Sequence, residues 1–114
     1  MVDDDASICR ALRRQLQILG FNVLVFKCGQ DVLAAEFPTS DTCLLLDVYM
    51  AGMNGIELCR SLAAAGRGLP TILMSGCDNQ QTRQMMRRAS PIASLFKPFD
   101  EKTLLRALRK ALRN

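Results

Sequence analysis

The chain contains no histidine, and no two of its cysteines form a C-x-x-C pair. The usual zinc sites and thiol redox centres are built from such residues at close spacing, so both kinds of site are excluded. The five cysteines lie far apart, at Cys9, Cys28, Cys43, Cys59 and Cys77. We expect reduced thiols that pack in the core of a cytosolic protein.

Long apolar runs are also missing. No run approaches the ~18 residues that span a bilayer, and the first residues are acidic, whereas a secretory signal is basic and then apolar. A length of 114 residues allows one compact domain and is too short for two. We therefore expect residues 1–114 to form a single cytoplasmic domain without membrane contact and without an additional effector domain.

Positive charge is concentrated near the C-terminus of a chain whose net charge is +4. The basic residues of the last third include Arg83, Arg87, Arg88, Arg106, Arg109, Lys110 and Arg113. They could form a solvated helix face, or meet an acidic partner or nucleic acid. Because no aromatic residues alternate with them and no DNA-reading motif is present, direct nucleic-acid binding is not expected.

The spacing of apolar residues predicts helices that alternate with short strands. The run Cys43–Leu46 has no polar alternation, which is typical of a strand buried on both faces of a parallel sheet. This alternation predicts an α/β fold, a doubly wound parallel sheet with helices on both faces. Helices are expected around residues 8–19, 30–37, 55–65, 79–89 and 100–112, and strands around 22–26, 43–46, 71–74 and 92–96.

Polar side chains stand at the ends of the predicted strands. Asp3 and Asp4 follow a short first strand, Asp47 and Ser75 close the next two apolar runs, and Lys97 closes the last. All strands of an open parallel sheet end at one edge, so these groups should converge there. Carboxylates in a cluster repel one another unless a hard divalent cation and an ammonium offset their charge, which predicts a Mg²⁺ site suited to phosphoryl chemistry.

The sequence resembles the receiver domain of two-component response regulators over essentially its whole length. The resemblance is carried by the runs at residues 2–5 (VDDD), 45–47 (LLD) and 97–99 (KPF). Two further stretches, at 47–55 (DVYMAGMNG) and 73–76 (LMSG), resemble receivers of the nitrogen-fixation regulator type. The resemblance implies a flavodoxin-like five-stranded parallel sheet of order 2-1-3-4-5.

The resemblance also implies a role for each strand-end residue. Asp47 would be the phosphoacceptor, which takes a phosphoryl group from a sensor histidine kinase or a phosphotransfer protein. Asp4 would ligate Mg²⁺ directly, Asp3 would act largely through water, and the backbone carbonyl of Tyr49 would be a further ligand.

Two other residues would contact the phosphoryl group itself, Ser75 by a hydrogen bond and Lys97 by an ion pair. The Lys97–Pro98 bond is expected to be cis. The protein would be a signalling switch and not an enzyme, apart from self-catalysed phosphotransfer and slow autodephosphorylation.

Two features depart from the family pattern. Ser94 occupies the position where the family usually has a rotating tyrosine or phenylalanine, so signal output is expected to be unusual. Only Met1 and Val2 precede Asp3, so the first strand is truncated. Either the numbered chain is trimmed or a partner supplies the missing strand.

Two other functions compete with the phosphorylation switch. A phosphatase of the haloacid dehalogenase type also forms an acyl phosphate on aspartate, but it needs a second acid two residues later, where this chain has Tyr49. The stronger alternative is a receiver-fold interaction module that acts without phosphorylation through its basic C-terminal helices. Its partner would be an acidic protein or a lost effector domain.

Overall fold

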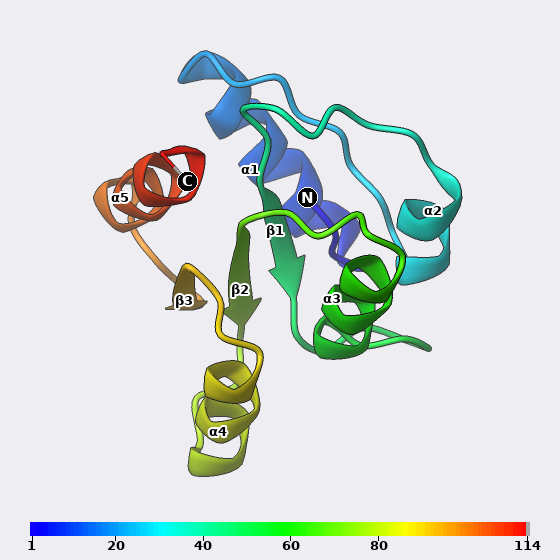
Figure 1. The fold of residues 1–114 in the computed structure, drawn as a ribbon. Coiled ribbons are helices and arrows are strands. Elements are labelled where there is room, and N and C mark those ends of the chain that lie inside the picture. The colour runs from blue at the N-terminus through cyan, green and yellow to red at the C-terminus, as the bar shows by residue number, and fades with distance from the viewer. Residues whose placement is uncertain (114) are drawn as a thin grey trace.

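The computed structural model describes residues 1–113 and forms a parallel sheet flanked by helices (Figure 1). Its strands are β1 (Leu44–Asp47), β2 (Thr71–Ser75) and β3 (Ala93–Phe96), in the order β1-β2-β3. Both strand pairs are parallel. Strand β1 lies one residue later than the strand predicted at Cys43–Leu46: Leu44–Leu46 are buried as their apolar run predicts, and Asp47 is buried with them.

The segment around Val2 lies beside β1 without forming a strand of its own. Val2 makes isolated parallel bridges with Leu46 on one side and Phe26 on the other. Its amide donates to the Leu45 carbonyl at 2.8 Å, and its carbonyl accepts from the Asp47 amide at 2.9 Å. The strand predicted at residues 22–26 is therefore reduced to one bridge, and within residues 1–113 three of the five expected strands form.

The helices are α1 (Ala6–Ile18), α2 (Gly29–Ala34), α3 (Gly55–Ala64), α4 (Gln80–Arg88) and α5 (Glu101–Leu112). Four of them begin after a side chain that accepts hydrogen bonds from first-turn amides, and these caps are Asp5, Asn54, Asn79 and Asp100. Asp100 is the cap that the sequence predicts for the last helix.

Helix α2 ends earlier than predicted. The sequence suggested a helix to Phe37, but Ala35 already has extended backbone angles. The reason is an arginine on a distant loop: the Arg67 guanidinium donates to the carbonyls of Leu33 and Ala35. These bonds satisfy carbonyl groups at the helix end and stabilise the early exit of the chain.

Apolar side chains pack on both faces of the sheet, as a doubly wound fold requires. Leu45 belongs to the core cluster that also contains Leu16 and Leu108, from α1 and α5. Its neighbour Leu46 belongs to the opposite cluster, which includes Leu58 of α3. The expectation of helices on both faces is therefore confirmed.

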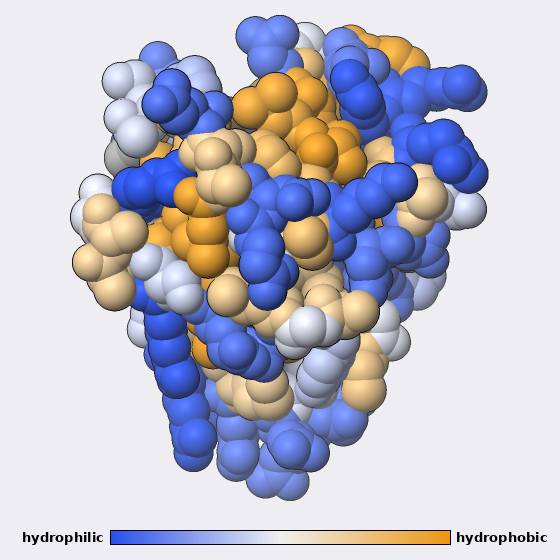
Figure 2. Space-filling view, turned by 90° about the vertical axis from the view of Figure 1, so that its right-hand side faces the viewer, coloured by the Kyte–Doolittle hydropathy of each residue, from blue (hydrophilic) through white to orange (hydrophobic). Residues whose placement is uncertain are grey.

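An apolar cavity of about 510 Å³ lies at the amino-terminal end of the sheet, lined by Leu24, Phe37 and Leu44 among others. Figure 2 shows apolar side chains gathered in the upper part of one face, framed by hydrophilic ones. The polar strand ends lie at the opposite edge of the sheet. In residues 1–113, no helix has the length and apolar character needed to cross a membrane.

Candidate functional site: an acidic cluster at the carboxyl edge of the sheet

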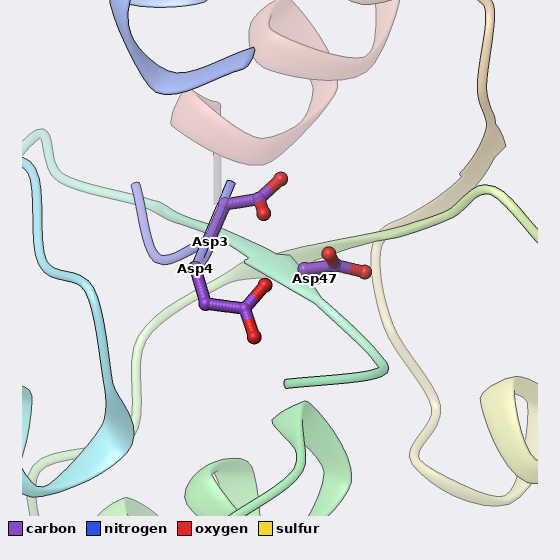
Figure 3. A group of neighbouring side chains, drawn as sticks. All are labelled: Asp3, Asp4 and Asp47. Carbon is purple, nitrogen blue, oxygen red and sulfur yellow. The ribbon is translucent and has the colours of Figure 1, made fainter. Parts of the chain in front are cut away.

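Three carboxylates meet where Val2 and β1 end. Each of Asp3, Asp4 and Asp47 offers an oxygen within 4.8 Å of the others. Figure 3 shows the three carboxylates projecting to the same side of the chain. Asp3 is fully buried, Asp47 is 8% exposed and Asp4 faces solvent. The parallel strands bring these residues together as expected, because Val2 lies in register with Leu46.

The backbone of the loop after β1 supports this cluster. The Ala51 amide donates to Asp4 Oδ2 at 3.0 Å, and the Tyr49 amide lies 3.4 Å from Asp47 Oδ1. On the other side, the Asp5 amide donates to Asp3 Oδ1 at 3.0 Å. These contacts orient the carboxylates while leaving oxygen atoms for a ligand.

Lys97 carries the positive charge that faces the carboxylates. Its Nζ atom lies 2.7 Å from Asp3 Oδ2 and 3.3 Å from Asp47 Oδ2. Burial lowers the pKa of Lys97, but the hydrogen bond to Asp3 and the charges of both aspartates outweigh that effect and leave the pKa raised. Lys97 is therefore protonated at neutral pH. The Lys97–Pro98 bond is cis, as the resemblance suggested.

The single ammonium group of Lys97 does not neutralise the charge of the three carboxylates. Burial raises the pKa of Asp47, the charge of Asp3 raises it further, and Lys97 offsets only part of the rise, so that the pKa lies at about 6. Excess negative charge on buried oxygen atoms is the environment that a hard divalent cation stabilises. The oxygen donors present fit Mg²⁺, which binds to one or two carboxylates and keeps several waters.

Ser75 stands at the same edge but its hydroxyl is occupied. The Lys97 amide donates to the Ser75 carbonyl at 2.8 Å, which fixes the two strand ends side by side. The Ser75 Oγ atom donates to the Cys77 carbonyl and accepts from the Cys77 amide, both at 3.0 Å. The hydroxyl has a single proton, which it donates to the Cys77 carbonyl, so donation to a group on Asp47 requires it to leave that carbonyl.

Comparison with known proteins identifies this arrangement. The family model described as response regulator receiver domain matches residues 1–109. The chain belongs to the receiver-domain family of response regulators. Members of this family are signalling switches of two-component systems, not enzymes of the classical kind, and they typically use Mg²⁺ at an acidic pocket.

Similar full-length proteins are response regulators. The receiver is 33% identical over 116 residues to response regulator MprA of Mycolicibacterium vanbaalenii, covering 99% of this chain and 49% of that protein. It is 34% identical over 113 residues to response regulator TmoT of Ectopseudomonas mendocina, covering 99% and 51%. The chain thus spans about half the length of these relatives.

Solved structures show the same fold. The response regulator StyR superposes with a TM-score of 0.85 at 39% identity, covering 98% of this chain and 57% of that one. The beryllofluoride-activated receiver of RstA from Klebsiella pneumoniae gives a TM-score of 0.84 at 26% identity, covering 99% and 96%. FixJ-N gives 0.87 at 25% identity, covering 99% and 90%.

Sequence reasoning missed one contact of this receiver. The Tyr49 hydroxyl lies 2.6 Å from Thr82 Oγ1 on α4, and the sequence patterns give no indication that these two residues meet. Thr82 is fully buried on a helix whose sequence is otherwise mainly polar. A lone threonine in a predicted helix carries no sequence signal of such a contact, because its partner is 33 residues away.

Proposed function

We propose that the receiver accepts a phosphoryl group on Asp47 and thereby changes its binding to partners. The observation that carries the proposal is the position of the buried Asp47 carboxylate, among Asp3, Asp4 and the Lys97 ammonium. A carboxylate oxygen of Asp47 attacks phosphorus in line. The bond from phosphorus to the donor breaks, and the departing imidazole of a histidine kinase or phosphotransfer protein keeps the electron pair.

The residues that would hold Mg²⁺ are Asp4 and Asp47 directly, Asp3 largely through water, and Tyr49 through its backbone carbonyl. When bound, the ion neutralises negative charge that builds up on the phosphoryl oxygens. Lys97 already lies beside Asp47 and would pair with one phosphoryl oxygen. Ser75 would donate to another after its hydroxyl turns away from Cys77.

The proposal extends to the sheet and to partners. We place the segments of Phe26 and Val2 as strands 2 and 1 of a 2-1-3-4-5 order, supported by the bridges from Phe26 to Val2 and from Val2 to Leu46. Residues 1–114 would act as one receiver unit, of which Asn114 lies outside the described residues. The free thiols are in keeping with a cytoplasmic location.

The output partner is proposed to be acidic, either a separate protein or an effector domain. The exposed basic side chains of α4 and α5 support this part of the proposal, and they are Arg83, Arg87, Arg88, Arg106 and Arg109. The same side chains are the observation that favours the alternative, an interaction module that needs no phosphorylation.

Incubation with acetyl phosphate and Mg²⁺ followed by intact mass measurement tests the proposal. We expect a phosphoryl adduct on the wild type and none on Asp47→Asn. Asp31→Asn is the matched control, because Asp31 is exposed on α2 and does not belong to the acidic cluster, and its substitution removes the same charge. An unmodified wild type, or an adduct that persists on Asp47→Asn, would overturn the proposal and leave the interaction module.

A further inference from the structure

We infer that the hydrogen bond between Tyr49 and Thr82 holds α4 in its resting position and is released when Asp47 is phosphorylated. Tyr49 and Thr82 would then be positioning residues that transmit the state of the site to the face formed by α4, β3 and α5, which we call the output face. This inference rests on the proposed function and goes beyond it, because it names the contact through which phosphorylation reaches a helix.

The geometry shows why the hydroxyl group matters. Tyr49 is 43% exposed, so burial alone stabilises the position of its side chain only in part. Its Oη atom reaches the fully buried Thr82 Oγ1 at 2.6 Å, and lies 3.9 Å from the Met85 sulfur. The contact joins the loop after β1 to α4 across 33 residues of sequence.

Helix α4 has few other contacts to hold it. Of its nine residues only Thr82 and Met86 are buried. Arg83 pairs with Asp78 and lies over the Phe96 ring, but the Arg83 and Asp78 side chains are 52% and 46% exposed, and exposed ion pairs contribute little to stability. Met86 belongs to the core and Met85 packs against it, so apolar contacts hold one side of the helix, and the hydrogen bond to Thr82 adds a directional contact at its first turn.

The other end of the contact is tied to the phosphoacceptor. Tyr49 lies two residues beyond Asp47, and its amide is 3.4 Å from Asp47 Oδ1. Conversion of this carboxylate to an acyl phosphate changes the charge and the size of the group that the amide faces. The backbone of Tyr49 must adjust, and a short hydrogen bond at the end of its rigid ring does not tolerate displacement.

The contact also offers an aromatic link between the site and α4 in place of the tyrosine or phenylalanine that the family usually has at position 94. Ser94 on β3 is exposed and has no ring that could link the site to the output face. Tyr49 supplies an aromatic side chain that reaches α4 from the β1 side instead. A ligand-induced change requires an interaction that differs between the two states, and this hydrogen bond is such an interaction.

Hydrogen–deuterium exchange of α4 tests the inference. In the wild type, phosphorylation by acetyl phosphate and Mg²⁺ should speed exchange of α4 amides by about fivefold, which corresponds to one net hydrogen bond. In Thr82→Val and Tyr49→Phe, exchange should already be this fast at rest and should change little on phosphorylation. The double variant should match the single variants, because both remove the same contact.

Controls separate this inference from the proposed function. Intact mass of the same samples gives the fraction of adduct, and exchange is compared at equal fractions. Thr103→Val is the matched control: it makes the same substitution on α5, where the Thr103 side chain hydrogen bonds to the Asp100 cap and has no part in the contact with Tyr49, and it should respond like the wild type. If adduct forms and α4 responds equally in wild type and Tyr49→Phe, the inference is wrong and the proposed function stands. If no protein forms adduct, both fail.

Tyrosine fluorescence gives a second measurement. The chain has one tyrosine and no tryptophan, so its emission reports on Tyr49 alone. Emission of the wild type should change on phosphorylation, and resting Thr82→Val should already show the emission of the phosphorylated wild type. Emission that is unaltered by both phosphorylation and Thr82→Val would overturn the inference, even if one variant folds poorly.

Discussion

The Lys97 ammonium lies closer to Asp3 than to the proposed phosphoacceptor, at 2.7 Å against 3.3 Å. Asp3 is fully buried, so its charge requires a partner, and Lys97 supplies it. Asp47 shares the same ammonium at a longer distance and keeps the raised pKa of about 6. The resting site is therefore unevenly neutralised, and the group left with excess charge is the one expected to react.

Removal of the Lys97 charge should destabilise the fold. Lys97→Met leaves Asp3 buried without its ion-pair partner, and we expect a loss of about 2 kcal/mol in the free energy of unfolding. Urea denaturation at neutral pH measures it. Lys102→Met, on the exposed first turn of α5, is the matched control and should change little. A loss below about 0.5 kcal/mol, the size of ordinary surface changes, would contradict this account.

The pKa of Asp47 predicts how stability varies with pH in the absence of Mg²⁺. The pKa in the folded protein is about 6 and its ordinary value is 3.8, so the folded state holds this proton more tightly than the unfolded chain. The contribution of this bound proton to the free energy of unfolding therefore falls as the pH rises between these values. The loss is complete above about pH 6.

Asp47→Asn removes this titration. At pH 7 in EDTA the variant should be more stable than the wild type by about 1 to 2 kcal/mol, less than the full linkage value because the site is partly solvated. The difference should vanish near pH 4. Urea denaturation at several pH values measures it, with Asp31→Asn as the control. A wild type as stable as Asp47→Asn at both pH values would show that Asp47 is not strained by its neighbours.

Mg²⁺ should stabilise the folded protein through the acidic cluster. An ion that binds the folded state stabilises it, so we expect the melting temperature to rise with Mg²⁺ concentration and Asp4→Asn to abolish most of the rise. Asp5→Asn is the matched control: it removes the same charge one residue away, and asparagine can still cap α1 as Asp5 does. Equal Mg²⁺ responses in the two variants would place the ion elsewhere.

Much of this arrangement follows from sequence patterns alone. The expected strand at 71–74 and helix at 100–112 differ from β2 and α5 by one residue, because buried apolar runs and the Asp100 cap are local signals. The strand-end residues converge because parallel strands end together. The strand expected at 22–26 is reduced to a bridge at Phe26 for a non-local reason: in residues 1–113 the backbone of Leu24 and Phe26 pairs with Met1 and Asp3, and this pairing is set by a segment distant in sequence.

The details of the site that were missed depend on side-chain direction. The Ser75 hydroxyl bonds within its own turn, and Tyr49 turns its ring toward α4. The spacing of apolar residues predicts neither side-chain orientation, because each depends on which nearby polar group the hydroxyl bonds to.

The basic output face predicts the oligomeric state of the activated protein. Helices α4 and α5 flank β3 and carry exposed arginines at positions 83, 87, 88, 106 and 109, and a symmetric dimer through this face would bring like charges together. We expect the beryllofluoride-activated protein to sediment as a monomer at near-physiological salt.

Reversing two of these charges, as in Arg87→Glu combined with Arg109→Glu, should favour association, since a mixed surface can pair with itself. A tight activated homodimer of the wild type through α4 and α5, or a double variant that dimerises less than the wild type, would show that the arginines take part in self-association and do not oppose it.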